Sequence, residues 1–208
     1  MHQNIIRMRK RLFLLLLAFI SLCQMNAVER TKLNFNGGWL LKVGDFPGAE
    51  QANYKDAGWK QITLPRAFNE KEAFKVSIEH LSDTITWYRK HFHIQEVGDR
   101  KYFIEFEGVR FGADIWLNGK KVGYTENGVM ASGFDLTPYI IKGENVIAVR
   151  VDNSWNYRER TSGQRFQWND KNFNANYGGI PKNVFLHITD KLYQTLPLYN
   201  NLQTTGTY

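Results

Sequence analysis

The chain has 208 residues, with 27 Lys or Arg against 20 Asp or Glu, and a formal net charge of +7 at pH 7. Four of the basic residues and no acidic residue lie in residues 1–27, and no Lys/Arg run longer than a pair follows them. The charge distribution therefore argues against a nucleic-acid partner. The length suffices for one domain with its own hydrophobic core.

The first 27 residues have the pattern of an export signal. Basic residues precede the apolar run 12–22, and an acceptable cleavage site ends at Ala27. We expect cleavage there and export to a bacterial periplasm or to the exterior. The apolar run is shorter than the roughly 20 residues of a membrane span. Cys23 follows Leu22, where a lipoprotein signal needs a small residue, so we do not expect a lipid anchor. Cys23 is the one cysteine of the chain, so the mature domain has no disulfides.

After this leader, short segments of alternating apolar and polar residues follow one another between turn residues. The alternation is clearest around Ile147, Val149 and Val151, which share one apolar face. No segment after the leader shows an apolar stripe of helical period over three turns. The pattern predicts an all-β sandwich or barrel. The predicted strands are 39–43, 61–64, 86–94, 101–107, 113–118, 121–125, 145–152 and 183–189.

A tight hairpin is predicted at Asn118-Gly119, between the strands 113–118 and 121–125. Asn-Gly is a strong hairpin signal because both central residues of a type I′ turn need positive φ. We therefore expect these two strands to be antiparallel neighbours.

The wording of several segments resembles one protein family. They resemble the N-terminal sugar-binding domain of glycoside hydrolase family 2, the β-galactosidase and β-glucuronidase family, over nearly all of the mature chain. Three positions depart from the family pattern: Arg66 stands where the family often has His, Phe68 where it often has Trp, and Lys182 where it usually has Arg. The segments are Asn36-Gly37-Gly38-Trp39, 56–65, Trp87-Tyr88-Arg89-Lys90-His91-Phe92, Phe106-Glu107-Gly108-Val109, 115–123, 134–139, 143–153 and 177–184.

The resemblance implies a fold and a domain order. The fold would be a jelly-roll β-sandwich, galactose-binding-domain-like, over residues 28–190. Residues 191–208 would form a linker or the first strand of an immunoglobulin-like domain, and a catalytic (β/α)8 barrel would follow. Periodicity alone does not separate a jelly roll from an immunoglobulin-like sandwich.

Catalysis in the resembled family depends on two glutamates of that barrel, which we do not find in these 208 residues. Retaining glycosidases need two carboxylates about 5–5.5 Å apart. Glu105 and Glu107 share a strand face, but we interpret this face as a solvated outer surface because exposed carboxylates on strands are common. We therefore assign no catalytic residue. The chain resembles part of an enzyme that hydrolyses O-glycosyl bonds, and we expect it to be inactive alone.

His91 and His93 share another strand face, an arrangement that can ligate a metal. No Cys or carboxylate cluster supports them in the sequence, so we interpret them as ordinary strand histidines. The sequence shows no serine nucleophile elbow, HExxH helix or phosphate-binding glycine loop. We assign no metal site and no cofactor.

The segment 152–179 is the main candidate for function, since it is much longer than the usual connection of about 4–6 residues. It interleaves aromatic residues with arginines and amides, and this mixture suits sugars, whose C–H faces pack on rings while polar groups bond the hydroxyls. The alternative is that the aromatics pack the loop onto the sheet or onto the barrel. The candidate sugar-binding residues are Asp152, Asn153, Arg165, Trp168, Asn169 and Asp170.

Asp152 and Asn153 end the strand 145–152, where side chains leave the sheet. In β-galactosidases of the resembled family, an acidic residue near this strand end helps to bind a sugar hydroxyl and a monovalent cation. Asn153 would take that place with an amide, which weakens the expectation of a monovalent or divalent cation in the intact enzyme. Turn capping is the alternative role for both residues.

We interpret the chain as the sugar-binding domain of an exported family 2 glycoside hydrolase that degrades carbohydrate. The expected partners are a carbohydrate, such as a β-galactoside, together with the immunoglobulin-like domain and the barrel. We expect neither nucleic-acid binding nor a membrane span. Two alternatives stay open, which are a free-standing carbohydrate-binding module and a scaffold domain without a ligand.

Overall fold

The computed structural model describes residues 30–69, 83–126, 128, 130–165 and 177–193. Within these ranges the fold is all-β, as the sequence predicts, with twelve strands and no helix. None of the described residues therefore belongs to a helix that could cross a membrane. The strands are β1 (Thr31–Asn34), β2 (Trp39–Val43), β3 (Lys60–Ile62), β4 (Arg66–Ala67), β5 (Ile85–Ile94), β6 (Arg100–Phe106), β7 (Gly112–Leu117), β8 (Lys120–Thr125), β9 (Ser132–Asp135), β10 (Gly143–Asp152), β11 (Gly179–Ile180) and β12 (Val184–Asp190).

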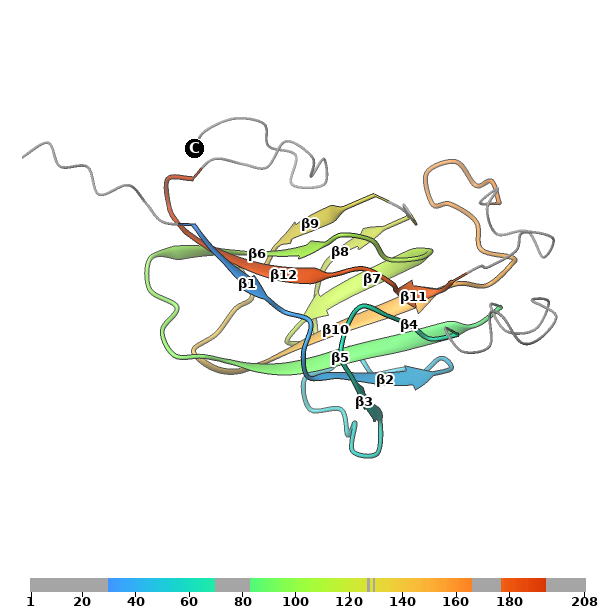
Figure 1. Cartoon of the computed structure of the whole chain (residues 1–208), viewed down its shortest axis with the longest axis horizontal. Coiled ribbons are helices and arrows are strands. Elements are labelled where there is room, and N and C mark those ends of the chain that lie inside the picture. Colours follow the sequence, from blue (N-terminus) through green and yellow to red (C-terminus); the bar gives the residue numbers. More distant parts are fainter. Residues whose placement is uncertain (1–29, 70–82, 127, 129, 166–176, 194–208) are drawn as a thin grey trace, which may run out of the picture.

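The strands form two main antiparallel sheets packed face to face (Figure 1). The larger sheet has the order β3-β2-β5-β10-β7-β8, and the smaller has the order β1-β12-β6-β9. The short pair β11-β4 lies at one end of the sandwich, the right-hand end in Figure 1. The loop after β10 leaves from this same end.

The main core lies between the two sheets and follows the predicted alternation. In β10, Ile147, Val149 and Val151 are fully buried, and Val149 stands opposite Ile115 of β7. The facing sheet contributes Ile104 and other residues of β6, β9 and β12 to the same cluster. Because a shift by one residue would turn these apolar side chains away from the core, their burial fixes the pairing register of the two sheets.

A second, smaller core covers the outer face of the larger sheet. The connection 44–59 between β2 and β3 carries Trp59 onto this face, where it packs with Trp87 and Ala148. Trp87 and Trp116 are stacked there with ring centroids 5.5 Å apart. Arg89 of β5, fully buried, ties the connection to the sheet through Asp56, with Nε 2.7 Å from Oδ2.

The Asn118-Gly119 hairpin is present as predicted. Both residues have positive φ, 53° and 79°, and the turn joins β7 to β8. The Asn118 side chain also holds the neighbouring chain, because its Nδ2 donates to Asn145 Oδ1 at 2.8 Å and its Oδ1 accepts from the Val146 backbone N at 2.8 Å.

All eight predicted strands are present, with ends shifted by at most two residues. Four further strands, β1, β4, β9 and β11, were not predicted. β4 and β11 have two residues each, and β1 is exposed along its whole length, so neither length nor alternation marks them. The predicted leader 1–27 and the part 194–208 of the predicted linker lie outside the described residues.

Candidate functional site

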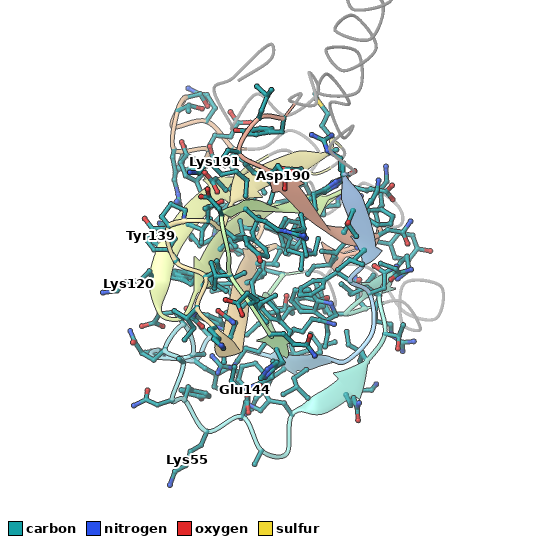
Figure 2. All side chains as sticks on the ribbon, turned by 90° about the vertical axis from the view of Figure 1, so that its left-hand side faces the viewer. Lys55, Lys120, Tyr139, Glu144, Asp190 and Lys191 are labelled. Carbon is teal, nitrogen blue, oxygen red and sulfur yellow. The ribbon has the colours of Figure 1, made fainter. Side chains whose placement is uncertain are left out.

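The loop-bearing end of the sandwich gathers segments that are far apart in the sequence. β10 ends at Asp152, which pairs with Gly112 at the start of β7. Arg110, just before β7, forms an isolated β-bridge with Gly179 of β11. Figure 2 looks onto the opposite end, where the charged residues Lys120, Glu144, Asp190 and Lys191 lie.

Asp152 caps the turn that follows β10. Its Oδ1 accepts hydrogen bonds from the backbone N of Ser154, at 3.0 Å, and from the Ser154 hydroxyl. Its Oδ2 lies 3.5 Å from Nη1 of Arg150. One carboxylate oxygen is thus engaged by the turn, and the other faces a cation.

Asn153 is fully buried, and its backbone N donates to the Thr84 carbonyl at 3.0 Å. Gly178 passes so close that a Cβ there would lie 2.7 Å from the Asn153 amide. This close approach requires glycine at position 178. The loop therefore leaves β10 and returns to β11 through neighbouring, closely packed positions.

These residues do not fit a cation site. The Asp152 carboxylate accepts hydrogen bonds from Ser154 and faces the positively charged Arg150. Among the described residues, no group of three or more His, Cys, Asp or Glu side chains could hold a metal ion. We therefore derive no chemical step through a cation here.

The outgoing half of the loop is clamped onto the outer face of β7 by an arginine–carboxylate pair. The Arg160 guanidinium donates two hydrogen bonds to the Asp114 carboxylate, with distances of 2.8 and 2.6 Å. Lys121 Nζ lies 2.7 Å from the same carboxylate. Burial raises the pKa of Asp114, but the hydrogen bonds from Arg160 and Lys121 outweigh it and hold that pKa below its usual range.

Tyr157 adds a second attachment. Its hydroxyl donates to Glu126 Oε1 at 2.6 Å, and the same oxygen accepts from the Arg160 backbone N at 2.7 Å. The Tyr157 ring covers Gly112, where any Cβ would collide with it. Burial, followed by the bond to Glu126, raises the pKa of Tyr157. The loop is thus fixed at two points before its next turn.

Residues 158–165 form a small hairpin of their own. Arg158 and Arg165 are joined by an isolated β-bridge, and the Glu159 backbone N donates to the Gln164 carbonyl at 2.9 Å. The Arg165 guanidinium donates to the Trp155 carbonyl from Nε, at 3.1 Å, and from Nη2, at 2.8 Å. The other predicted sugar-binding residues, Trp168, Asn169 and Asp170, lie outside the described residues.

The expectation that Glu105 lies on a solvated face is wrong. Glu105 is 5% exposed and is hydrogen-bonded to His187 of β12, which is also buried. Lys32 of β1 lies 3.3 Å from the same carboxylate. Glu107, further along, accepts from Asn183 Nδ2 at 2.8 Å. Each carboxylate is therefore engaged by a neighbouring strand or turn, which the alternation along β6 alone does not reveal.

His91 and His93 contact different carboxylates. His91 Nε2 lies 2.7 Å from Asp56 Oδ2, and His93 Nδ1 lies 2.9 Å from Glu144 Oε1. Both imidazoles are largely exposed. The two rings thus make separate surface pairs.

Sequence reasoning missed the residues that hold the loop. Arg160 and Asp114 are 46 positions apart, and Tyr157 and Glu126 are 31 apart, so no local pattern links them. Arg110 was also missed. Its one sequence signal is its position between two strands, next to the segment that resembles the family.

Comparison with known proteins identifies the family to which the chain is similar. The glycosyl hydrolase 2 galactose-binding domain-like family matches residues 30–187. A β-glucuronidase from Formosa agariphila is 41% identical over 191 residues, which are 86% of this chain and 19% of that protein. A β-galactosidase from Thermoanaerobacter pseudethanolicus is 33% identical over 162 residues, or 76% of this chain and 21% of that protein.

Among solved structures, a β-glucuronidase from glycoside hydrolase family 2 is similar with a TM-score of 0.74 and 40% identity, covering 88% of this chain and 20% of that chain. The chain spans about a fifth of the length of the curated relatives it matches. The resemblance seen in the sequence is confirmed: the chain belongs to the glycosyl hydrolase 2 galactose-binding domain-like family.

Proposed function

We propose that this chain is the N-terminal, jelly-roll sugar-binding domain of an exported family 2 glycoside hydrolase that degrades β-galactosides, β-glucuronides or related glycans. In that enzyme its loop residues would line part of the sugar site of a catalytic barrel. The observation that carries the proposal is the family match over residues 30–187, together with the separate 191-residue match that covers only 19% of the β-glucuronidase relative. A single non-catalytic domain of a larger enzyme gives a match of this kind.

The attachment of the loop supports a role at a sugar site. The Arg160–Asp114 pair and the Tyr157–Glu126 bond hold the outgoing half of the loop against the sheet. A loop that is fixed in advance loses less conformational entropy when a ligand binds. Arg165 ends the small hairpin 158–165, and its guanidinium donates to the Trp155 carbonyl, which links these two residues. The loop can therefore present aromatic and polar groups in a fixed arrangement.

A chimera tests the proposal. Residues 30–190 of this chain would replace the matching domain of the Formosa agariphila β-glucuronidase, and loop variants would be compared within that chimera. Trp168→Ala and Arg165→Ala are expected to lower kcat/KM about 10- to 100-fold, or about 1.4–2.7 kcal/mol, because contacts to the sugar are lost. The melting temperature should barely change. Steady-state kinetics and thermal melting measure the two effects.

Arg100→Ala is the matched control, since Arg100 is exposed and begins β6 at the opposite end of the sandwich. It should leave kcat/KM unchanged.

The 208-residue chain alone should hydrolyse neither aryl β-galactosides nor aryl β-glucuronides. Loop variants that melt early but keep full activity would show that the loop only packs. Glycan binding by the chain alone that is as tight as binding by the chimera would instead favour a free-standing carbohydrate-binding module.

Export is the second part of the proposal and rests on the order of basic, apolar and cleavage regions in residues 1–27. Protein secreted by a bacterial host is expected to begin at Val28. N-terminal sequencing makes the measurement. A first residue of Met1, or an acylated Cys23, would contradict it.

A further inference from the structure

Arg110 stands at the loop-bearing end of the sandwich, between β6 and β7. Its backbone N and O each form a 2.8 Å hydrogen bond with Gly179 of β11. Two residues later, Gly112 pairs with Asp152, the last residue of β10. The Arg110 backbone is therefore held in place beside the positions from which the long loop leaves and to which it returns.

The Arg110 side chain is half-buried and lies on an apolar surface. Its guanidinium carbon is 4.8 Å from the centroid of the fully buried Phe111 ring. Gly128 leaves it room, since a Cβ there would lie 3.2 Å from Arg110 Cγ. Close packing on both sides thus fixes the stem of this side chain.

The guanidinium has no polar partner among the described residues. Its Nε is fully buried without a hydrogen bond. Among the described residues, the two terminal nitrogens form no hydrogen bond or ion pair either, and Arg110 is only half-buried. One edge of the fork is therefore open to an incoming ligand.

Three other arginines of the described residues have carboxylate partners. Arg89 is paired with Asp56, Arg150 with Asp45, and Arg160 with Asp114. Two described carboxylates at this end of the sandwich, those of Asp152 and Glu126, are engaged elsewhere. Asp152 accepts from Ser154, and Glu126 accepts from Tyr157. Neither of these two carboxylates is therefore a counter-ion for Arg110.

A desolvated cation without a counter-charge is costly. Burial lowers the pKa of Arg110, which reflects this cost. Contact with the Phe111 ring offsets only part of it. A planar guanidinium fork matches a carboxylate or sulfate, each of which can accept two parallel hydrogen bonds.

We propose that Arg110 binds the anionic substituent, a carboxylate or a sulfate ester, of an acidic sugar at this end of the sandwich. The inference rests on the proposed function, because it assumes that sugars reach the loop-bearing end. It goes further by assigning a specificity residue and a chemical class, the anionic sugars. Neutral sugars of the same shape would leave the guanidinium without a partner.

The test uses the full 208-residue chain and NMR detection of the Arg110 Nε–H signal. The probes are methyl β-D-glucuronide against methyl β-D-glucoside, and galactose 6-sulfate against galactose, with inorganic sulfate as a sugar-free anion. We expect an anionic sugar to shift the Arg110 signal and the Gly112 and Gly179 amides. The neutral counterpart should bind about tenfold more weakly, the difference that one charge-assisted pair provides. The glucuronide and sulfate arms distinguish the two sources of charge.

Arg110→Gln should abolish the shifts of the Gly112 and Gly179 amides, and Arg110→Lys should weaken binding because it keeps the charge but loses the fork. Arg100→Gln, which removes the same charge at the opposite end, should bind as the unaltered chain does. The melting temperature of Arg110→Gln should stay equal or rise, since an unpaired cation is removed.

Three results would overturn the inference: equal shifts with neutral sugars, equally strong shifts with inorganic sulfate alone, or a marked loss of melting temperature in Arg110→Gln. Each is separate from the chimera kinetics. If Trp168→Ala and Arg165→Ala left kcat/KM of the chimera unchanged, that result would count against the proposed function. The NMR shifts caused by anionic sugars could still be measured.

Discussion

Replacing Arg89 by methionine is expected to lower the free energy of unfolding by about 3–5 kcal/mol, the usual cost of breaking a buried charge pair. Arg89 is fully buried, and its Nε donates to Asp56 Oδ2 at 2.7 Å. Its Nη1 also donates to the carbonyls of Ala49 and Gln51. Methionine fills much of the volume but leaves these acceptors without their donor. Urea unfolding of both proteins measures the loss.

Lys55→Met is the matched control, because Lys55 lies on the same connection but is exposed and points outward in Figure 2. It should change stability by no more than about 0.5 kcal/mol. A similarly small loss in Arg89→Met would mean that the connection 44–59 does not depend on this arginine.

The Arg89 effect should depend on pH. Burial raises the pKa of Asp56, but Arg89 and His91 outweigh it, so the folded pKa lies below the unfolded one. The ionised Asp56 therefore stabilises the fold above the unfolded pKa of about 3.9, and this contribution disappears as the pH falls through the folded pKa. The stability difference between Arg89→Met and the unaltered chain should narrow below about pH 4. A stability difference between the two proteins that does not change with pH would argue against the Arg89–Asp56 charge pair as its cause.

Ile115→Ala is expected to destabilise the fold by about 2–5 kcal/mol through lost burial and an unfilled cavity. Ile115 is fully buried in the main core and stands opposite Val149 of the neighbouring strand. Ile141→Ala is the control, because Ile141 is 51% exposed and should cost at most about 0.5 kcal/mol. Denaturant unfolding compares the two. Equal losses would place Ile115 outside the core.

The part of the fold that follows from local pattern could be predicted from the sequence. The alternation around Val149 and the Asn-Gly turn at 118–119 both report backbone geometry within a few residues, and both are confirmed. Short strands such as β4 and β11 could not be predicted, because two residues carry no period. They exist because Gly179 and Ala67 are brought together by the rest of the chain.

The candidate site could be predicted only in outline. A long loop rich in aromatics and amides indicates a functional region, but its attachment depends on partners such as Arg160 and Asp114, 46 positions apart. Glu105 shows the same limit: its partner His187 is 82 positions away, so a residue expected to be solvated is buried. Alternation shows which side chains share a face, and only the tertiary fold decides whether that face is covered.

The position of β12 has a consequence for biosynthesis. β12 lies between β1 and β6, so the first strand of the domain has no sheet partner except this last one. The smaller sheet therefore cannot close until Val184–Asp190 has left the ribosome. Such a long-range pairing is slow to form. Until then β1 has no neighbouring strand, and its backbone N–H and C=O groups stay unpaired and open to other strands.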